Sequence, residues 1–155
     1  MSVSDQPLVG IIMGSASDAE VVQKAQDQLD AFGLPYEVIV ASAHRNPDKV
    51  RSWAAALAGR GVKVVIAAAG KAAALPGVVA GFTTLPVIGV PIKTSDLGGL
   101  DSLLSIVQMP SGVPVATVAI NGAKNAAILA CEIIASGDSA YAAKMRQYKE
   151  DMAHA

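Results

Sequence analysis

The chain alternates short aliphatic runs with segments of helical spacing. The first run, residues 8–13 (LVGIIM), is uninterrupted by any polar side chain and stops at Gly14. Such a run is typical of a strand that is buried on both faces. From about residue 18 to residue 32 the apolar positions recur every three or four residues, which predicts an amphipathic helix that Gly33 ends. Strands that alternate with helices in this way predict βαβ units and a parallel sheet.

The same alternation continues along the rest of the sequence. Further strands are predicted at residues 36–40, 62–68, 86–90 and 113–120, and helices at about residues 46–58, 73–81, 100–107, 123–136 and 139–152. The second helix is expected to open with Asn46 as its N-cap and Pro47 at its first position. The sequence therefore predicts an α/β protein: a single-domain, three-layer, flavodoxin-like fold with a five-stranded parallel sheet in the order 2-1-3-4-5.

The length predicts one domain over residues 1–155, with a core at about residues 8–136 and a helical tail at about 139–152. There are 12 Lys and Arg against 13 Asp and Glu, which gives a net charge of −1 and argues against nucleic-acid binding. Only 16% of residues are charged while 52% are hydrophobic, so the chain has little charge to cover a large wet surface. Self-association into a homo-oligomer is expected.

Membrane insertion and export are not expected. Residues 72–92 carry no charge, but Pro76, Pro86 and Pro91 break this stretch into pieces too short for a membrane helix. The start of the chain lacks a basic segment followed by an apolar one, so no signal peptide is predicted. With the single Cys131 and no zinc-type spacing, the sequence predicts a cytoplasmic protein without disulfides and without a metal site.

Three loops are expected to form the functional site. With the strand order 2-1-3-4-5, a ligand binds beyond the carboxyl ends of the strands, where the order reverses between the first and third strands. The loops at that place are residues 14–18 (GSASD), 42–45 (SAHR) and 69–77 (AGKAAALPG). They hold small, polar or ionisable residues, whereas the strands before them are mostly aliphatic.

The first loop combines a helix start with two further polar side chains. Ser17 and Glu20 match the S-x-x-E capping box, which predicts that they cap the following helix. Ser15 and Asp18 are left over, and next to a helix N-terminus they could hold an anion and ribose hydroxyls.

The second and third loops supply the basic side chains. His44 is one of two histidines, and the other, His154, lies in the last residues of the chain. At the end of a strand, His44 could transfer protons and Arg45 could clamp a phosphate, although a structural histidine and a solvated arginine are equally open at this point. Lys71 is either a solvated lysine or the partner of a carboxylate or carbamate. The low side-chain bulk of its loop, as at Gly70, lets a ligand approach the backbone.

Several common cofactor motifs are missing from the sequence. It contains no G-x-x-x-x-G-K-[ST], no G-x-G-x-x-G after the first strand and no H-E-x-x-H, so ATP, NAD and catalytic zinc are not indicated. No aromatic residue in the three loops could stack on a flavin. The residues alone predict a small α/β enzyme that binds a phosphate ester and uses one histidine.

Three segments together resemble the PurE family. Residues 14–18 are similar to its GSxSD motif, residues 42–45 to SAHR, and residues 101–110 to DSLxSIVQMP. The resemblance covers about residues 9–135, and three motifs in order are far more specific than any one. It implies N5-carboxyaminoimidazole ribonucleotide mutase activity in purine biosynthesis, a homo-octamer with active sites near subunit contacts, no cofactor, and a functional link to the ATP-dependent synthetase that makes the substrate.

The resemblance also assigns roles to residues. It implies that Ser15, Asp18 and Arg45 bind the ribonucleotide and that His44 is the catalytic residue, which protonates the leaving nitrogen and later removes the proton from the ring carbon. Ser42, Gly70 and Lys71 complete the expected substrate-binding set.

The third loop departs from the typical mutase pattern AGGAAHLPG at two positions, Lys71 and Ala74. Both look more like the branch of the family that carboxylates aminoimidazole ribonucleotide directly with CO2 and has AGRSNALSG. Arg45 and the 105–110 stretch, however, resemble the mutases. The sequence favours the mutase and leaves open a direct carboxylase and a non-catalytic nucleotide-binding module.

Overall fold

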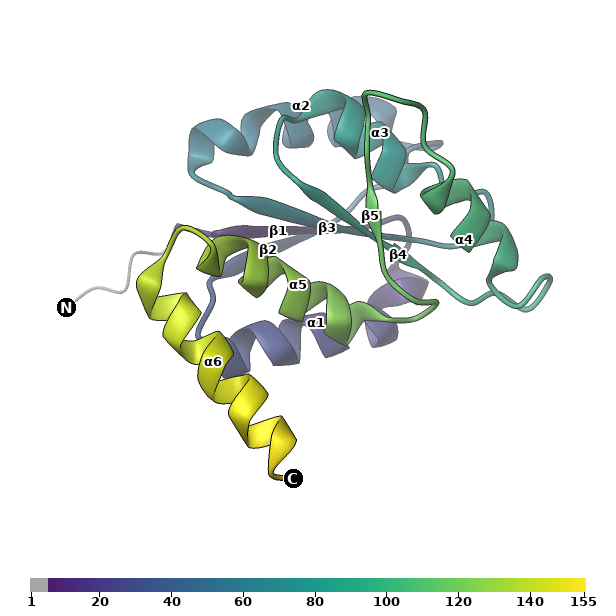
Figure 1. Ribbon diagram of the computed structural model, residues 1–155. Coiled ribbons are helices and arrows are strands. Elements are labelled where there is room, and N and C mark those ends of the chain that lie inside the picture. Colours follow the sequence, from purple (N-terminus) through teal and green to yellow (C-terminus); the bar gives the residue numbers. More distant parts are fainter. Residues whose placement is uncertain (1–5) are drawn as a thin grey trace.

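A parallel five-stranded sheet lies between two layers of helices (Figure 1). The computed structural model describes residues 6–155; residues 1–5, part of the segment where no signal peptide is predicted, lie outside the described residues. The strands are β1 (Val9–Met13), β2 (Tyr36–Val40), β3 (Val64–Ala69), β4 (Val87–Pro91) and β5 (Ala116–Thr117). Their order is β2-β1-β3-β4-β5, and every neighbouring pair is parallel, which confirms the predicted fold class and strand order.

The helices divide between the two faces of the sheet. They are α1 (Ala19–Phe32), α2 (Pro47–Ala56), α3 (Leu75–Phe82), α4 (Leu100–Val107), α5 (Ala123–Ala135) and α6 (Ser139–Ala153), with 3-10 turns η1 (Ala16–Asp18) and η2 (Ala58–Arg60). Helices α1 and α5 cover one face, α2 and α3 cover the other, and α6 packs on the outside of α5 (Figure 1). Among residues 6–155, no helix has the length and apolar character needed to cross a bilayer.

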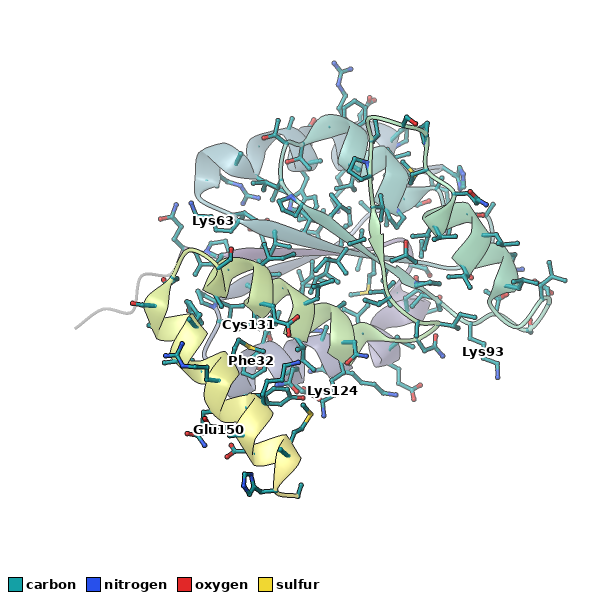
Figure 2. The ribbon with its side chains drawn as sticks, viewed as in Figure 1. Phe32, Lys63, Lys93, Lys124, Cys131 and Glu150 are labelled. Carbon is teal, nitrogen blue, oxygen red and sulfur yellow. The ribbon has the colours of Figure 1, made fainter. Side chains whose placement is uncertain are left out.

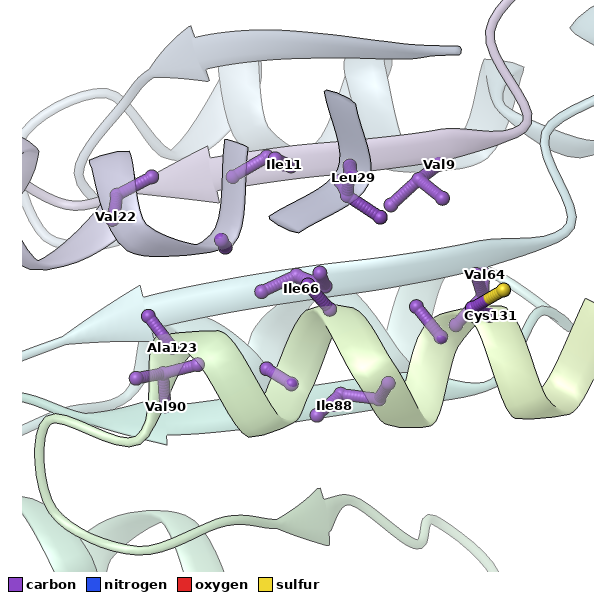
Figure 3. Close-up of a cluster of buried hydrophobic side chains, with 14 of the residues drawn as sticks. Val9, Ile11, Val22, Leu29, Val64, Ile66, Ile88, Val90, Ala123 and Cys131 are labelled. Carbon is purple, nitrogen blue, oxygen red and sulfur yellow. The ribbon is translucent and has the colours of Figure 1, made fainter. Parts of the chain in front are cut away.

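Alternate residues of the central strands enter two separate apolar cores. On β1, Ile11 faces the core beneath α1 and α5, which also contains Leu29 and Cys131 (Figure 3). The next residue, Ile12, belongs to the opposite core beneath α2 and α3, together with Val79. Because both faces of β1 and β3 are covered, every residue of these strands is buried, and their sequences are continuously apolar instead of alternating.

Helix α1 ends where the sequence predicts. Gly33 adopts the left-handed conformation with φ 63°, and the N–H of Leu34 donates to the carbonyl of Leu29, which closes the last turn. Helix α6 attaches at this same end. Lys144 Nζ donates to the carbonyl of Phe32 at 2.6 Å. The Phe32 ring, labelled in Figure 2, meets the Tyr148 ring edge to face with the ring centroids 5.3 Å apart. The C-terminal helix is therefore fixed to the body of the protein.

One predicted capping interaction and one predicted strand boundary need correction. Asn46 stands before α2 as expected, but its side chain makes no cap hydrogen bond; instead Oδ1 accepts from the N–H of Ser42 at 3.4 Å. The fifth strand covers only Ala116–Thr117 instead of residues 113–120. Pro114 has no N–H to donate to a ladder, and β5 is an edge strand with a neighbour on one side only.

The close approach of α4 to β4 generates a stability prediction. A Cβ placed on Gly89 would overlap Ile106 of α4 and lie 3.0 Å from Val115 Cγ1. Gly89→Ala should therefore lower the free energy of unfolding by about 1–3 kcal/mol, because the core must shift to admit the methyl group. Chemical denaturation followed by circular dichroism measures the change.

The matched control is Gly81→Ala in α3, where a Cβ would meet nothing within 4 Å. This variant should be unchanged or more stable by up to about 1 kcal/mol, since alanine favours the helix. Equal losses in both variants would contradict the packing argument.

Candidate active site

The carboxyl edge of the sheet carries a cavity of about 470 Å³. The loops that follow β1, β2 and β3 line it, and Thr94 from the loop after β4 completes the wall. All the predicted site residues line this one cavity: Ser15, Asp18, Ser42, His44, Arg45, Gly70 and Lys71. The structure thus brings together three loops that are far apart in the sequence, as expected for a crevice between the first and third strands.

The loop after β1 is organised by Ser15, and the predicted capping box is wrong. Ser15 Oγ accepts from the N–H of Ser17 at 3.3 Å and from its hydroxyl at 2.9 Å. Ser17 lies inside the 3-10 turn η1, while Asp18 occupies the N-cap position of α1 without a side-chain cap bond. The extra turn shifts Ser17 away from the position where its hydroxyl could meet the first free N–H groups of α1.

Asp18 is the one acidic residue among the residues that line the cavity. It is only 8% exposed, and this burial raises the pKa of its carboxyl, although hydrogen bonds with the Ser15 backbone and the Ser17 hydroxyl act in the opposite direction. A buried carboxylate gains from each additional donor it can accept from. Two adjacent hydroxyl groups of a ribose would supply such donors.

The loop after β2 is held by Ser42. Its hydroxyl oxygen accepts from the backbone N–H groups of His44 at 3.3 Å and Arg45 at 3.2 Å, so it fixes the turn that presents both side chains. Arg45 Nη2 donates to the carbonyl of Gly14 at 3.3 Å, which ties this loop to the one after β1. His44 is exposed, and within residues 6–155 its ring has no hydrogen-bond partner. The imidazole is therefore open to a ligand.

The loop after β3 is tight and is built almost entirely from alanine and glycine. A Cβ on Gly70 would lie 3.0 Å from Thr94 Cγ2, so a side chain at this position would require Thr94 to move by a few tenths of an ångström. Lys71 has a φ of 52°, in the left-handed region that disfavours side chains. Its ammonium pairs with Asp96 Oδ2 at 2.8 Å, and this hydrogen bond raises the pKa of the Lys71 side chain. Lys71 is exposed, as the solvated interpretation expects, but it already has a carboxylate partner.

Sequence reasoning missed Thr94 and Asp96. Thr94 Oγ1 is buried and has no hydrogen-bond partner among the residues described, which is unusual for a hydroxyl that lines a cavity. Both residues follow β4, the neighbour of β3 in the sheet, so the strand order predicted from the sequence was the signal that could have identified this fourth loop. No group of three or more His, Cys, Asp or Glu side chains in the described part of the chain is placed to hold a metal ion.

Comparison with known proteins identifies the family. Residues 8–155 match the family described as AIR carboxylase. The chain belongs to the AIR carboxylase, or PurE, family. Its fold matches the crystal structure of Treponema denticola PurE with a TM-score of 0.86 at 35% identity, covering 96% of this chain and 92% of that one.

Curated relatives of this AIR carboxylase family member carry two names. The N5-carboxyaminoimidazole ribonucleotide mutase of Pyrococcus horikoshii is 56% identical over 149 residues, covering 96% of this chain and 84% of the relative. The mutase of Thermotoga maritima is 58% identical, with 94% of this chain and 85% of the relative covered. The phosphoribosylaminoimidazole carboxylase of Saccharomyces cerevisiae is 57% identical over 92% of this chain, but the chain spans only 25% of that protein.

The three family motifs occupy different places in the structure. Four of residues 14–18 and all of residues 42–45 line the cavity, whereas most of residues 101–110 form α4 and its end. Within α4, the Ser102 hydroxyl is fully buried and donates to the carbonyls of Ile92 at 2.6 Å and Gly99 at 3.2 Å. This motif therefore fixes the loop between β4 and α4, which carries Thr94 and Asp96.

The raised pKa of Asp18 predicts a pH-dependent stability difference. A carboxyl whose pKa is raised on folding stabilises the folded state fully when the pH is below its pKa in the unfolded chain, 3.8. This contribution is lost as the pH rises through the pKa of the folded state. Asp18→Asn removes the buried charge, so at pH 7 the ligand-free variant should be more stable than the wild type, and the difference should shrink as the pH falls toward 4. Thermal unfolding at both pH values measures it, and a difference independent of pH would contradict the argument.

Proposed function

We propose that this protein is an N5-carboxyaminoimidazole ribonucleotide mutase of purine biosynthesis. The observation that carries the proposal is the identity of 55–58% with mutases from five organisms, which extends over at least 90% of this chain. The cavity supports it, because a histidine, an arginine, a lysine and a buried carboxylate meet there on three loops. The reaction moves a carboxylate from the exocyclic nitrogen to a ring carbon, without ATP or another cofactor.

Four of the residues that line the cavity have roles that their positions support. The N–H groups and hydroxyl of the Ser15 loop, together with Arg45, face the negative charge of the phosphate, and Asp18 accepts from ribose hydroxyls. The carbamate C–N bond breaks, its electron pair stays on nitrogen, and His44 protonates that nitrogen. The ring carbon then attacks the released CO2, and His44 removes the proton from that carbon. One imidazole thus serves first as acid and then as base.

The alanine-rich loop after β3 suits the intermediate. CO2 is neutral and apolar, and it must stay beside the ring until the new bond forms. Ala69 and residues 72–74 line the cavity with methyl groups, which offer little to water and so favour retention of CO2 over hydration.

The direct carboxylase remains the second candidate function. Lys71 and Ala74 support it, and so does the 57% identity with the yeast carboxylase. The mutase is preferred because the chain spans 84–85% of the mutases of P. horikoshii and T. maritima but only about a quarter of the carboxylases. A binding module without turnover is disfavoured, because the exposed His44 ring lies in the same cavity as Arg45.

We also propose a cytoplasmic, single-domain protein that assembles into a homo-oligomer, with an octamer as the expected state, and that receives its substrate from an ATP-dependent synthetase. A candidate contact surface is the α4 stripe, which we define as Leu97, Leu100, Leu104 and Val107. All four are exposed and large; the spacing of Leu100, Leu104 and Val107 puts them on one side of α4, and Leu97 lies in the turn just before that helix. A second copy of this chain is the fitting occupant, because the chain has little surface charge and this stripe lies beside the cavity-lining loop after β4.

The test of the reaction uses two substrates without ATP. N5-carboxyaminoimidazole ribonucleotide alone should be converted rapidly to the ring-carboxylated product, as followed by absorbance, whereas aminoimidazole ribonucleotide with CO2 should react slowly. His44→Asn should lower turnover by about 10²–10⁴-fold, while calorimetry should still detect ligand binding. Conversion of the second substrate only would establish the direct carboxylase, and unchanged turnover of His44→Asn would remove the catalytic role of His44.

Sedimentation measures the assembly. The wild-type protein should sediment as an oligomer, and Leu100→Glu combined with Leu104→Glu should shift it toward smaller species, because two charges would be buried in the contact. Met152→Glu on α6 also replaces an exposed apolar residue, but it lies outside the α4 stripe and should leave the sedimentation unchanged. A monomeric wild type would contradict the assembly, and an unchanged double variant would exclude the stripe as its contact.

A further inference from the structure

The ion pair between Lys71 and Asp96 joins the loops that follow two neighbouring strands, β3 and β4. Nζ and Oδ2 are 2.8 Å apart. Lys71 lines the cavity, whereas Asp96 lies outside its lining. The lysine can therefore turn its ammonium either toward the cavity or toward the Asp96 carboxylate outside it.

The pair is weak enough to exchange partners. The side chain of Lys71 is 70% exposed and that of Asp96 is 57% exposed. Exposed pairs of this kind contribute little, because water screens the attraction and two long side chains must be held in place. A carboxylate that enters the cavity can therefore replace Asp96 at small cost.

The backbone beneath Lys71 is held more firmly than its side chain. The Lys71 carbonyl accepts from the N–H of Ala73 at 2.8 Å, and the neighbouring Gly70 is in close contact with Thr94. The φ of 52° at Lys71 persists inside this framework. The four side-chain methylenes can swing from a fixed origin, so the two positions of the ammonium differ by side-chain rotation alone.

The charges around the cavity leave one place for a second anion. Arg45 binds the carbonyl of Gly14 and lies with the loops after β1 and β2, where the phosphate is expected. On the side of the loop after β3, the other lining residues are alanine, glycine and leucine. Lys71 is the cation available there to a carboxylate, and Thr94 adds a hydroxyl that has no partner within residues 6–155.

We propose that Asp96 is a resident counter-ion that competes with the substrate's carboxylate for Lys71. This inference rests on the proposed function and deepens it. In the empty protein Asp96 holds the ammonium, and on binding the ammonium transfers to the carboxylate. When the carboxylate becomes neutral CO2, Lys71 returns to Asp96. The exchange limits how strongly the site stabilises the carboxylated ground state, and strong stabilisation of that state would slow the loss of CO2.

Two ligands that differ by one carboxylate test the exchange. Aminoimidazole ribonucleotide and its ring-carboxylated product are titrated by calorimetry into the wild type, Asp96→Asn, Lys71→Met and the double variant. Asp96→Asn should tighten binding of the carboxylated ligand about two- to fivefold, the range expected for an exposed pair, and leave the other ligand unchanged. Lys71→Met should weaken only the carboxylated ligand, and in the double variant the effect of Asp96→Asn should vanish.

Steady-state kinetics adds a second measurement. Asp96→Asn should lower both KM and kcat for the carboxylated substrate, because the freed ammonium stabilises the ground state. Glu150→Gln, which removes an exposed negative charge from α6, controls for the change in net charge and should alter neither constant. Unfolding midpoints equal to the wild type establish that each variant is folded.

The outcomes distinguish a failure of the proposed function from a failure of the proposed exchange at Lys71. If neither ligand binds to the wild type, the proposed function is wrong and the exchange falls with it. If both ligands bind but Asp96→Asn changes their affinities equally, or changes neither, the function stands and the exchange is overturned. Weaker binding of the carboxylated ligand to Asp96→Asn would also overturn it, because Asp96 would then support the bound state.

Discussion

Burial of the central strands on both faces is the constraint on which the rest of this structure depends. All residues of β1 and β3 are buried, so a polar side chain within them would lose its contact with water without a partner to replace it. Chemistry is therefore confined to the ends of the strands. Since all five strands are parallel, their carboxyl ends lie at one edge, and the loops after β1, β2 and β3 meet there around the cavity.

The same constraint explains which parts of the fold could be predicted from the sequence. Short, mostly apolar runs locate β1 to β4 within two residues, and Gly33 marks the end of α1 correctly because its left-handed conformation is a local property. Two of the wrong predictions concern which of several nearby groups a side chain hydrogen-bonds to. Ser17 and Asn46 both have side chains that suit a helix cap, but each bonds to a neighbouring loop group instead. Propensity alone does not distinguish these partners, because their free energies differ by little.

Some residues of the site could likewise be predicted from the sequence, and others could not. The seven residues predicted for the site line one cavity because strand order determines which loops meet, and the alternation of strands and helices predicts that order. Strand order also indicates that the loop after β4 lies beside the loop after β3, but it does not single out Thr94 and Asp96 within that loop, since their importance depends on side-chain contacts with Gly70 and Lys71. Ser15 and Ser42 show the reverse case: they were expected to bind substrate, and the structure adds that each hydroxyl oxygen also accepts hydrogen bonds that shape its own loop.

The energetic costs in this structure concentrate at the cavity. Asp18 is a buried acid, Thr94 has a hydroxyl without a partner in the described chain, and Lys71 holds a backbone conformation that glycine would adopt freely. A non-glycine residue in the left-handed region costs about 1–3 kcal/mol, and a buried hydroxyl without a partner costs a similar amount, about 1–3 kcal/mol. The two aliphatic cores must offset these costs. The mutase pattern AGGAAHLPG, which this loop resembles, has glycine where this chain has Lys71. A strained lysine in place of an unstrained glycine is not explained by folding, so its explanation lies in the ammonium that it brings to the rim of the cavity.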